Sequence, residues 1–311
     1  MIYKQAKFAN FKATDKLPLP GLLFETAKLK KVLINLHGNG GASVFYRPEK
    51  YQELAEAAAN AGWNFFAFNN RGAGITNKIK TLKNGRYSRY WCGTSHELIK
   101  DCVKDIDGAI SFLKSLSYKQ FALSGFSTGA NKICVYHYKK PSNPVSKNLI
   151  ICGADDSGLY FTEWGRKKFF DILRLCKKKV SQGKGRDFMD PATIGGRCYS
   201  YQGMYDILNP DGLYNTFPFW DRTKNLGLAK KKLFKEIKSI KSQSLVIYGD
   251  KDEYSFNQVE KNVEILKQEL KGKDNFRFEV IKDADHGFTG KEKQLGKLIT
   301  NFLKTNNAKR N

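Results

Sequence analysis

The sequence predicts an α/β fold with a mostly parallel central sheet flanked by helices, and three observations support this. Short apolar segments typical of buried strands alternate with segments of helical spacing. Several of these strands end in loops rich in glycine and polar residues, as expected at the carboxyl edge of an open α/β sheet. With 311 residues and 41% hydrophobic content, the chain can bury one large core and carry a substantial insertion.

The chain opens with two predicted edge strands, at residues 2–8 and 17–24. Pro18 and Pro20 exclude a central position for the second strand, because proline cannot donate to a sheet ladder.

A buried-strand run over residues 31–36 ends in His37-Gly-Asn-Gly-Gly41, where successive glycines let backbone N–H groups point into a cavity. This pattern is typical of an oxyanion loop, with the N–H of Asn39 as donor, and we assign its histidine to the loop and not to base catalysis. A phosphate loop is disfavoured because G-x-G-x-x-G and the Walker lysine are absent. A helix over 51–61 and a strand over 64–68 complete a β-α-β unit.

The next segment is predicted to be structural. Residues 69–74 form a loop at the carboxyl edge of the sheet, in which Arg71 has a structural role. Thr94-Ser-His-Glu97 fits a capping box that opens a helix over about 95–116, whose apolar residues recur near helical spacing.

The central motif is Gly125-Phe-Ser-Thr-Gly129, which lies between an apolar strand and a helix over 130–138. This is the G-x-S-x-G pattern of a nucleophile elbow, in which a serine sits on a strained turn and its neighbours two residues away must lack side chains. Ser127 is therefore the candidate nucleophile, and the N–H of Thr128 is the second candidate oxyanion donor. A strand follows over 148–152.

Residues 153–242 exceed the length that a crossover between parallel strands requires, so we predict a lid inserted into a core formed by 1–152 and 243–311. A helix over 163–180 can cover a site with its apolar face. The remainder of the insertion is rich in glycine and aromatic residues, which can serve as lid core or as the wall of an apolar pocket; the sequence leaves both open.

The last part of the chain supplies an acid and a base. A strand over 244–248 ends in a loop that carries Asp250 and Asp252, and a strand over 276–281 precedes His286. Ser127 lies upstream of both, so the order along the chain is serine, acid, histidine. This is the order found in serine hydrolases whose nucleophile lies on a turn between a strand and a helix. Helices are predicted over 257–270 and 291–303.

The composition limits the partners and the location. No apolar run follows Met1 and no apolar stretch reaches about 18 residues, so we expect no signal peptide, no membrane span and a cytoplasmic location. The formal charge is +24. No nucleic-acid-binding signature accompanies it, so no nucleic-acid partner is expected, while weak contact with anionic surfaces stays open. The six scattered cysteines lack metal-ligand spacing and are expected to be reduced thiols.

Taken together, the motifs resemble those of the α/β-hydrolases over nearly the whole length, through His37-Gly-Asn-Gly-Gly, Gly125-Phe-Ser-Thr-Gly, Gly249-Asp-Lys-Asp252 and Asp285-His-Gly-Phe288. Asp101-Cys-Val-Lys-Asp-Ile-Asp107 is also similar to a group of lidded microbial hydrolases of unassigned substrate, itself similar to fungal siderophore esterases.

The resemblance implies the α/β-hydrolase fold and a serine esterase mechanism with Ser127 as nucleophile and His286 as base. It implies Asp252 as the acid, because the family's acid usually lies three residues after the glycine that ends its strand. Phe126 departs from the residue commoner before the nucleophile, which leaves the substrate preference open. A small acyl substrate is expected, and no metal or organic cofactor.

The sequence leaves two other functions open. A peptidase, thioesterase, lactonase or acyltransferase can use the same triad, and a non-catalytic protein could use only the basic surface. The sequence does not determine the oligomeric state.

Overall fold

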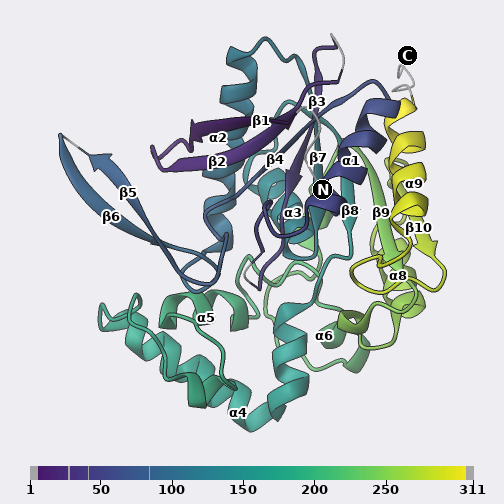
Figure 1. Cartoon of the computed structure of the whole chain (residues 1–311). Helices are drawn as coiled ribbons and strands as arrows, with labels where there is room; N and C mark the ends of the chain where they lie inside the picture. The colour runs from purple at the N-terminus through teal and green to yellow at the C-terminus, as the bar shows by residue number, and fades with distance from the viewer. Residues whose placement is uncertain (1–5, 27–28, 41, 84, 306–311) are drawn as a thin grey trace.

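The computed structural model describes residues 6–26, 29–40, 42–83 and 85–305. Its centre is an eight-stranded sheet in the order β1-β2-β4-β3-β7-β8-β9-β10 (Figure 1). The first three strands in this order pair antiparallel, and all later neighbours pair parallel, which confirms the predicted mostly parallel sheet. The strands are β1 Ala6–Lys12, β2 Pro18–Phe24, β3 Lys31–Leu36, β4 Asn64–Phe68, β7 Gln120–Phe126, β8 Val145–Ile151, β9 Gln243–Gly249 and β10 Phe276–Ile281.

Helices cover the sheet, so its central strands are buried on both faces. Every residue of β4 is buried, as is all of β3 after Lys31, as expected for parallel strands between helical layers. Helix α1 packs against α9, and α2 packs against α3. In Figure 1, α1 and the yellow α9 lie side by side. The helices are α1 Pro48–Asn60, α2 Cys102–Ser115, α3 Thr128–Lys139, α8 Val259–Glu269 and α9 Glu292–Lys304.

The prediction that the second strand lies at an edge is wrong. Strand β1 is the edge, and β2 pairs with both β1 and β4. The prolines are tolerated because Pro18 and Pro20 face only β1, whereas β4 pairs with Gly21 to Phe24. The first predicted strand, residues 2–8, extends further than expected, to Lys12, and its residues 2–5 lie outside the described part.

The segment between β4 and α2 differs most from the prediction. It contains an unpredicted hairpin, β5 Asn77–Lys83 with β6 Arg86–Cys92, which projects away from the large sheet in Figure 1. The predicted helix start and capping box are wrong, because a short 3₁₀ turn at Ile99–Asp101 precedes α2. Glu97 instead forms a buried ion pair with Lys132 at 2.7 Å. The structural role of Arg71 is confirmed, since its buried guanidinium lies 2.6 Å from Asp105.

Residues 153–242 add no strand to the large sheet. They form α4 Asp156–Ser181, a 3₁₀ turn at Pro191–Ile194, α5 Tyr201–Leu208, α6 Phe219–Lys224 and α7 Lys235–Lys238. In Figure 1, α4 and α5 lie below the sheet. Helix α4 has a break at Gly165 and buries Phe169, Ile172 and Cys176, which recur at helical spacing.

All six cysteines are free thiols, as predicted. Among the described helices, none has the length and apolar character that a bilayer crossing requires.

Candidate active site

Ser127 occupies a sharp turn between β7 and α3. Its backbone angles, φ 57° and ψ −127°, are unfavourable for a residue with a side chain. The flanking glycines explain how the turn closes: a Cβ on Gly125 would lie 2.2 Å from the carbonyl oxygen of Gly129, and a Cβ on Gly129 would lie 2.2 Å from that of Leu36. Both distances are impossible contacts, so this turn requires glycine at both positions.

The loops after β9 and β10 bring an acid and a histidine together. His286 Nδ1 lies 2.9 Å from Asp252 Oδ1, and the Asp252 side chain is 1% exposed. The same oxygen accepts the backbone N–H of Tyr254 at 2.9 Å. Because a carboxylate only accepts hydrogen bonds, Nδ1 carries the proton and Nε2 of the neutral ring keeps its lone pair. The imidazole can therefore accept a proton through Nε2.

The neighbouring carboxylate, Asp250, has a different partner. Its Oδ1 accepts the backbone N–H of Ala284 at 3.3 Å, which joins the two loops. Of the two acids that the sequence offers, the structure brings Asp252 to His286.

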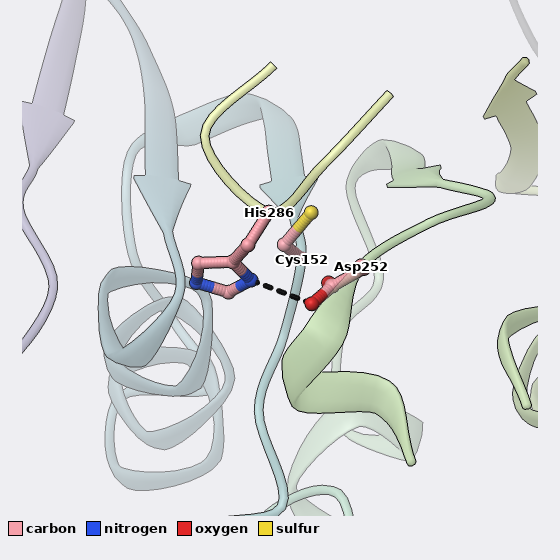
Figure 2. Close-up of side chains that lie close together, drawn as sticks. All are labelled: Cys152, Asp252 and His286. Carbon is pink, nitrogen blue, oxygen red and sulfur yellow. Dashed lines mark hydrogen bonds and ion pairs between the residues drawn. The ribbon is translucent and has the colours of Figure 1, made fainter. Parts of the chain in front are cut away.

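A third side chain, Cys152 at the end of β8, lies beside this pair (Figure 2). Its sulfur and the ligand atoms of Asp252 and His286 lie within 4.8 Å of one another, a spacing that could also hold a metal ion. Neighbouring ligands of a tetrahedral zinc are about 3.4 Å apart, however, so the 2.9 Å between Asp252 and His286 fits a direct hydrogen bond better. Burial, together with the nearby Asp252, raises the pKa of the Cys152 thiol and keeps it neutral.

The glycine loop after β3 lies against Ser127. A Cβ on Gly38 would be 3.0 Å from the Ser127 Cβ and 3.5 Å from its Oγ. Asn39 follows in this loop, and Thr128 is the first residue of α3, whose N–H has no acceptor within the helix. The two predicted oxyanion donors thus belong to the two segments that meet at Ser127. Gly41, the last residue of the predicted loop, lies outside the described residues.

Asn39 also connects the core to the 153–242 segment. Its side-chain amide donates to the hydroxyl of Tyr214 at 2.7 Å and lies 3.5 Å from that of Tyr199. Near these tyrosines lies Asp156, one carboxylate oxygen of which has no hydrogen-bond partner within the described part of the chain. Burial, reinforced by the charge of Asp155, raises the pKa of Asp156 to about 7.

His37 is excluded as the base by its hydrogen bonds. Its Nδ1 donates to the Gly38 carbonyl at 2.8 Å, and its Nε2 accepts the Asn70 N–H at 3.2 Å. Burial, with the nearby Lys132, lowers the pKa of His37 to about 3. Neither nitrogen is free to take a proton from a serine, which agrees with its assignment to the loop.

A pocket of about 1070 Å³ opens over Ser127. His286 and Phe126 line it from the core, and Asp156, Tyr160 and Tyr199 line it from the 153–242 segment. The aromatic residues of this segment serve both purposes that the sequence left open, since Tyr199 lines the pocket whereas Phe217 and Phe219 are buried in the core.

Sequence reasoning missed several charged residues of the pocket, and three of them bear on the chemistry of the site. Arg47 and Lys50 lie at the start of α1, and Asp156 opens α4. The only sequence signal for the first two is that their helix follows the glycine loop, and Asp156 follows β8 at the same edge of the sheet.

The family model described as "Serine aminopeptidase, S33" matches residues 27–294. Among curated proteins, no sequence matches this chain.

Solved structures similar to this chain include several hydrolases. Est1E from Butyrivibrio proteoclasticus, solved with ferulic acid, has a TM-score of 0.61 at 13% identity, covering 95% of this chain and 98% of that one. The Pyrococcus furiosus esterase Pf2001 has a TM-score of 0.58 at 17% identity, covering 96% and 90%. A bromoperoxidase from Bacillus anthracis has a TM-score of 0.55 at 15% identity, covering 96% and 100%. At these identities the likeness concerns the fold alone.

Proposed function

Because this chain belongs to the hydrolase family described as serine aminopeptidase S33 and has the α/β-hydrolase fold, we propose that it cleaves carboxylic esters through an acyl-enzyme. In this proposal Ser127 is the nucleophile, His286 the base and Asp252 the acid. The observation that carries it is the 2.9 Å hydrogen bond between His286 and Asp252, beside the pocket that Ser127 also lines.

The proposed mechanism has two steps. His286 Nε2 takes the proton of the Ser127 hydroxyl as Oγ attacks the ester carbonyl, and the N–H groups of Asn39 and Thr128 stabilise the oxyanion. The alcohol leaves with the proton from His286, and an acyl-serine remains. Water then gives its proton to His286 and attacks the acyl carbon, which releases the acid and restores Ser127. Asp252 stays ionised and stabilises the imidazolium in both steps.

We further propose that residues 153–242 act as a lid. The support for this is that they supply part of the pocket wall without contributing to the large sheet. A lid excludes water from the acyl-enzyme and determines which acyl and alcohol groups fit.

An aminopeptidase is the second candidate, favoured by the family description and by one observation. Asp156 presents an unpartnered carboxylate oxygen among the residues that line the pocket. Such a group can pair with the ammonium of a peptide N-terminus. Thioesterase, lactonase and acyltransferase activities use the same triad and are covered by the experiment below.

The test is a substrate panel with wild type and Ser127→Ala. Simple p-nitrophenyl esters, aminoacyl p-nitroanilides, thioesters and lactones are compared by kcat/KM. The proposal expects esters to be hydrolysed best and Ser127→Ala to lose roughly 10³-fold or more in kcat. The matched control is Ser115→Ala, which removes an exposed hydroxyl at the end of α2 and should keep wild-type activity.

Three results would change or refute the proposal. Faster cleavage of aminoacyl anilides than of esters would favour the aminopeptidase. Turnover that survives in Ser127→Ala would refute the nucleophile, and the absence of any turnover together with no labelling by a fluorophosphonate would favour a non-catalytic protein.

A further inference from the structure

Two basic side chains at the start of α1 border the candidate active site. Lys50 Nζ lies 3.2 Å from the centroid of the Phe126 ring, and Phe126 directly precedes Ser127. The same ring packs edge-on against the His286 imidazole, with centroids 5.1 Å apart. Arg47 lies near Gly287, the residue after the histidine, since its Nη1 would be 3.5 Å from a Cβ built on that glycine. Both cations line the pocket.

Neither cation has a carboxylate partner within the described chain: no ion pair within 4.0 Å and no side-chain hydrogen bond involves Arg47 or Lys50. The nearby carboxylate of Asp285 binds the main chain instead, because its Oδ1 accepts the backbone N–H of Thr289 at 2.8 Å. Glu253 likewise accepts the backbone N–H of His286 at 3.0 Å. The two cations are therefore left to face the pocket.

The environment of Lys50 favours the binding of an anion from the pocket. Burial lowers the pKa of its ammonium to about 7 and the charge of Arg47 acts in the same direction, whereas the charges of Asp285 and Glu292 raise the pKa without offsetting the burial. Because no carboxylate of the described residues pairs with Lys50 directly, an incoming anion would favour its charged form and supply charge-assisted hydrogen bonds. Phe126 holds the ammonium in place through its ring face.

The position of the cations identifies the part of the substrate they would contact. In the proposed mechanism His286 gives its proton to the leaving alcohol, so the leaving group lies next to the imidazole. Arg47 lies near Gly287, next to this histidine in the chain, and Lys50 lies over Phe126, whose ring contacts the imidazole.

We propose that Arg47 and Lys50 form an anion subsite for a carboxylate on the leaving group of the substrate. The proposal rests on the proposed ester hydrolysis and narrows it to esters whose alcohol portion is a hydroxy acid. An arginine fork and a lysine ammonium together offer enough donors for both oxygens of one carboxylate.

A matched pair of esters tests the subsite. 4-Acetoxybenzoate carries a carboxylate on its leaving group, and methyl 4-acetoxybenzoate lacks only the charge. We expect wild type to prefer the anionic ester by kcat/KM, after correction for the uncatalysed rates of the two esters. Lys50→Met and Arg47→Gln, which remove the charge and keep the first part of the side chain, should each lower the anionic-to-neutral ratio by roughly 10- to 100-fold. The control Lys114→Met removes an exposed lysine charge on α2 and should keep the wild-type ratio.

A second arm tests the assignment to the leaving group. Mono-4-nitrophenyl adipate and 4-nitrophenyl hexanoate differ by a carboxylate on the acyl side. The variants should change this ratio by less than about threefold. A preference that appears only with the adipate, or that survives in both variants, would overturn the proposal.

Binding is measured separately from turnover. Calorimetric titration of Ser127→Ala with the product 4-hydroxybenzoate should give an affinity that falls at least about tenfold when Lys50→Met is added. Equal binding by the single and double variants would overturn the subsite. Wild type that hydrolyses the neutral ester without preferring the anionic one would also overturn it, while leaving the proposed function intact. Failure to hydrolyse any ester would refute the proposed function, and the subsite with it.

Discussion

Replacing Asp252 by asparagine tests whether this carboxylate acts through His286. Asp252 Oδ1 accepts two N–H groups, from His286 Nδ1 and from the Tyr254 backbone, both at 2.9 Å. Asp250, two residues earlier on the same loop, accepts the Ala284 N–H at 3.3 Å. Asp250→Asn is therefore a control with the same chemistry at nearly the same position.

The expected loss follows from the geometry. Asparagine keeps the shape of the side chain but removes the buried negative charge that stabilises the imidazolium formed when His286 takes a proton. Its amide group can also hold the ring in the tautomer that protonates Nε2, which cannot accept a proton from Ser127. In comparable triads this change costs about 10⁴ in kcat, or about 5.4 kcal/mol in the barrier, and we expect a similar loss here.

The assay is kcat for p-nitrophenyl acetate at saturation, with thermal unfolding to confirm that both variants fold. Asp250→Asn should lower kcat by less than about threefold, because an asparagine carbonyl can still accept the Ala284 N–H. An inactive Asp250→Asn beside a normally active Asp252→Asn would show that the acid is misassigned, although a serine hydrolase reading would survive.

Three further predictions concern stability. Gly129→Ala should abolish activity and cost about 3 kcal/mol or more, because its Cβ would lie 2.2 Å from a β3 carbonyl oxygen. Gly296→Ala on α9, whose Cβ would meet the Ala57 Cβ at an ordinary contact distance of 3.6 Å, should be neutral or slightly stabilising in urea unfolding. The unfolded chain protonates His37 below about pH 6.5 but the folded protein only near pH 3, so the contribution of His37 to stability should fall by about 2 kcal/mol between about pH 7.5 and 5. This contribution is measured as the difference between the pH profiles of wild type and His37→Asn; identical profiles would contradict it. Lys132→Met should cost about 3–5 kcal/mol by leaving Glu97 buried and unpaired, and a cost below about 1 kcal/mol would show that the pair is not needed.

The strands and the turn at Ser127 could be predicted because their requirements are local. Apolar runs mark the buried strands β3, β4 and β7, and the turn needs glycine two residues on either side of Ser127. The order of serine, acid and histidine along the chain also follows from reading strand ends in sequence. The roles of these residues in catalysis remain predictions that the experiments above test.

The remaining features depend on contacts between distant segments. Glu97 matched a capping box, but it precedes the 3₁₀ turn and its partner is Lys132 on α3. Residues of the pocket such as Lys50 and Asp156 become neighbours of the site only when α1 and the 153–242 segment fold over it. The hairpin β5–β6 was missed although the sequence carries a signal for it, an Asn84-Gly85 dipeptide between two strand-like runs.

The central claim is that Ser127 becomes acylated. Wild type is quenched in acid during turnover of a slowly deacylating ester, or labelled with a fluorophosphonate, and digested with trypsin. The adduct should lie on the peptide that spans residues 120–132, and fragmentation should assign it to Ser127 and not to Ser124, which is buried and donates to Asn35. An adduct on Ser124, on another peptide, or on no peptide while turnover proceeds would contradict the account.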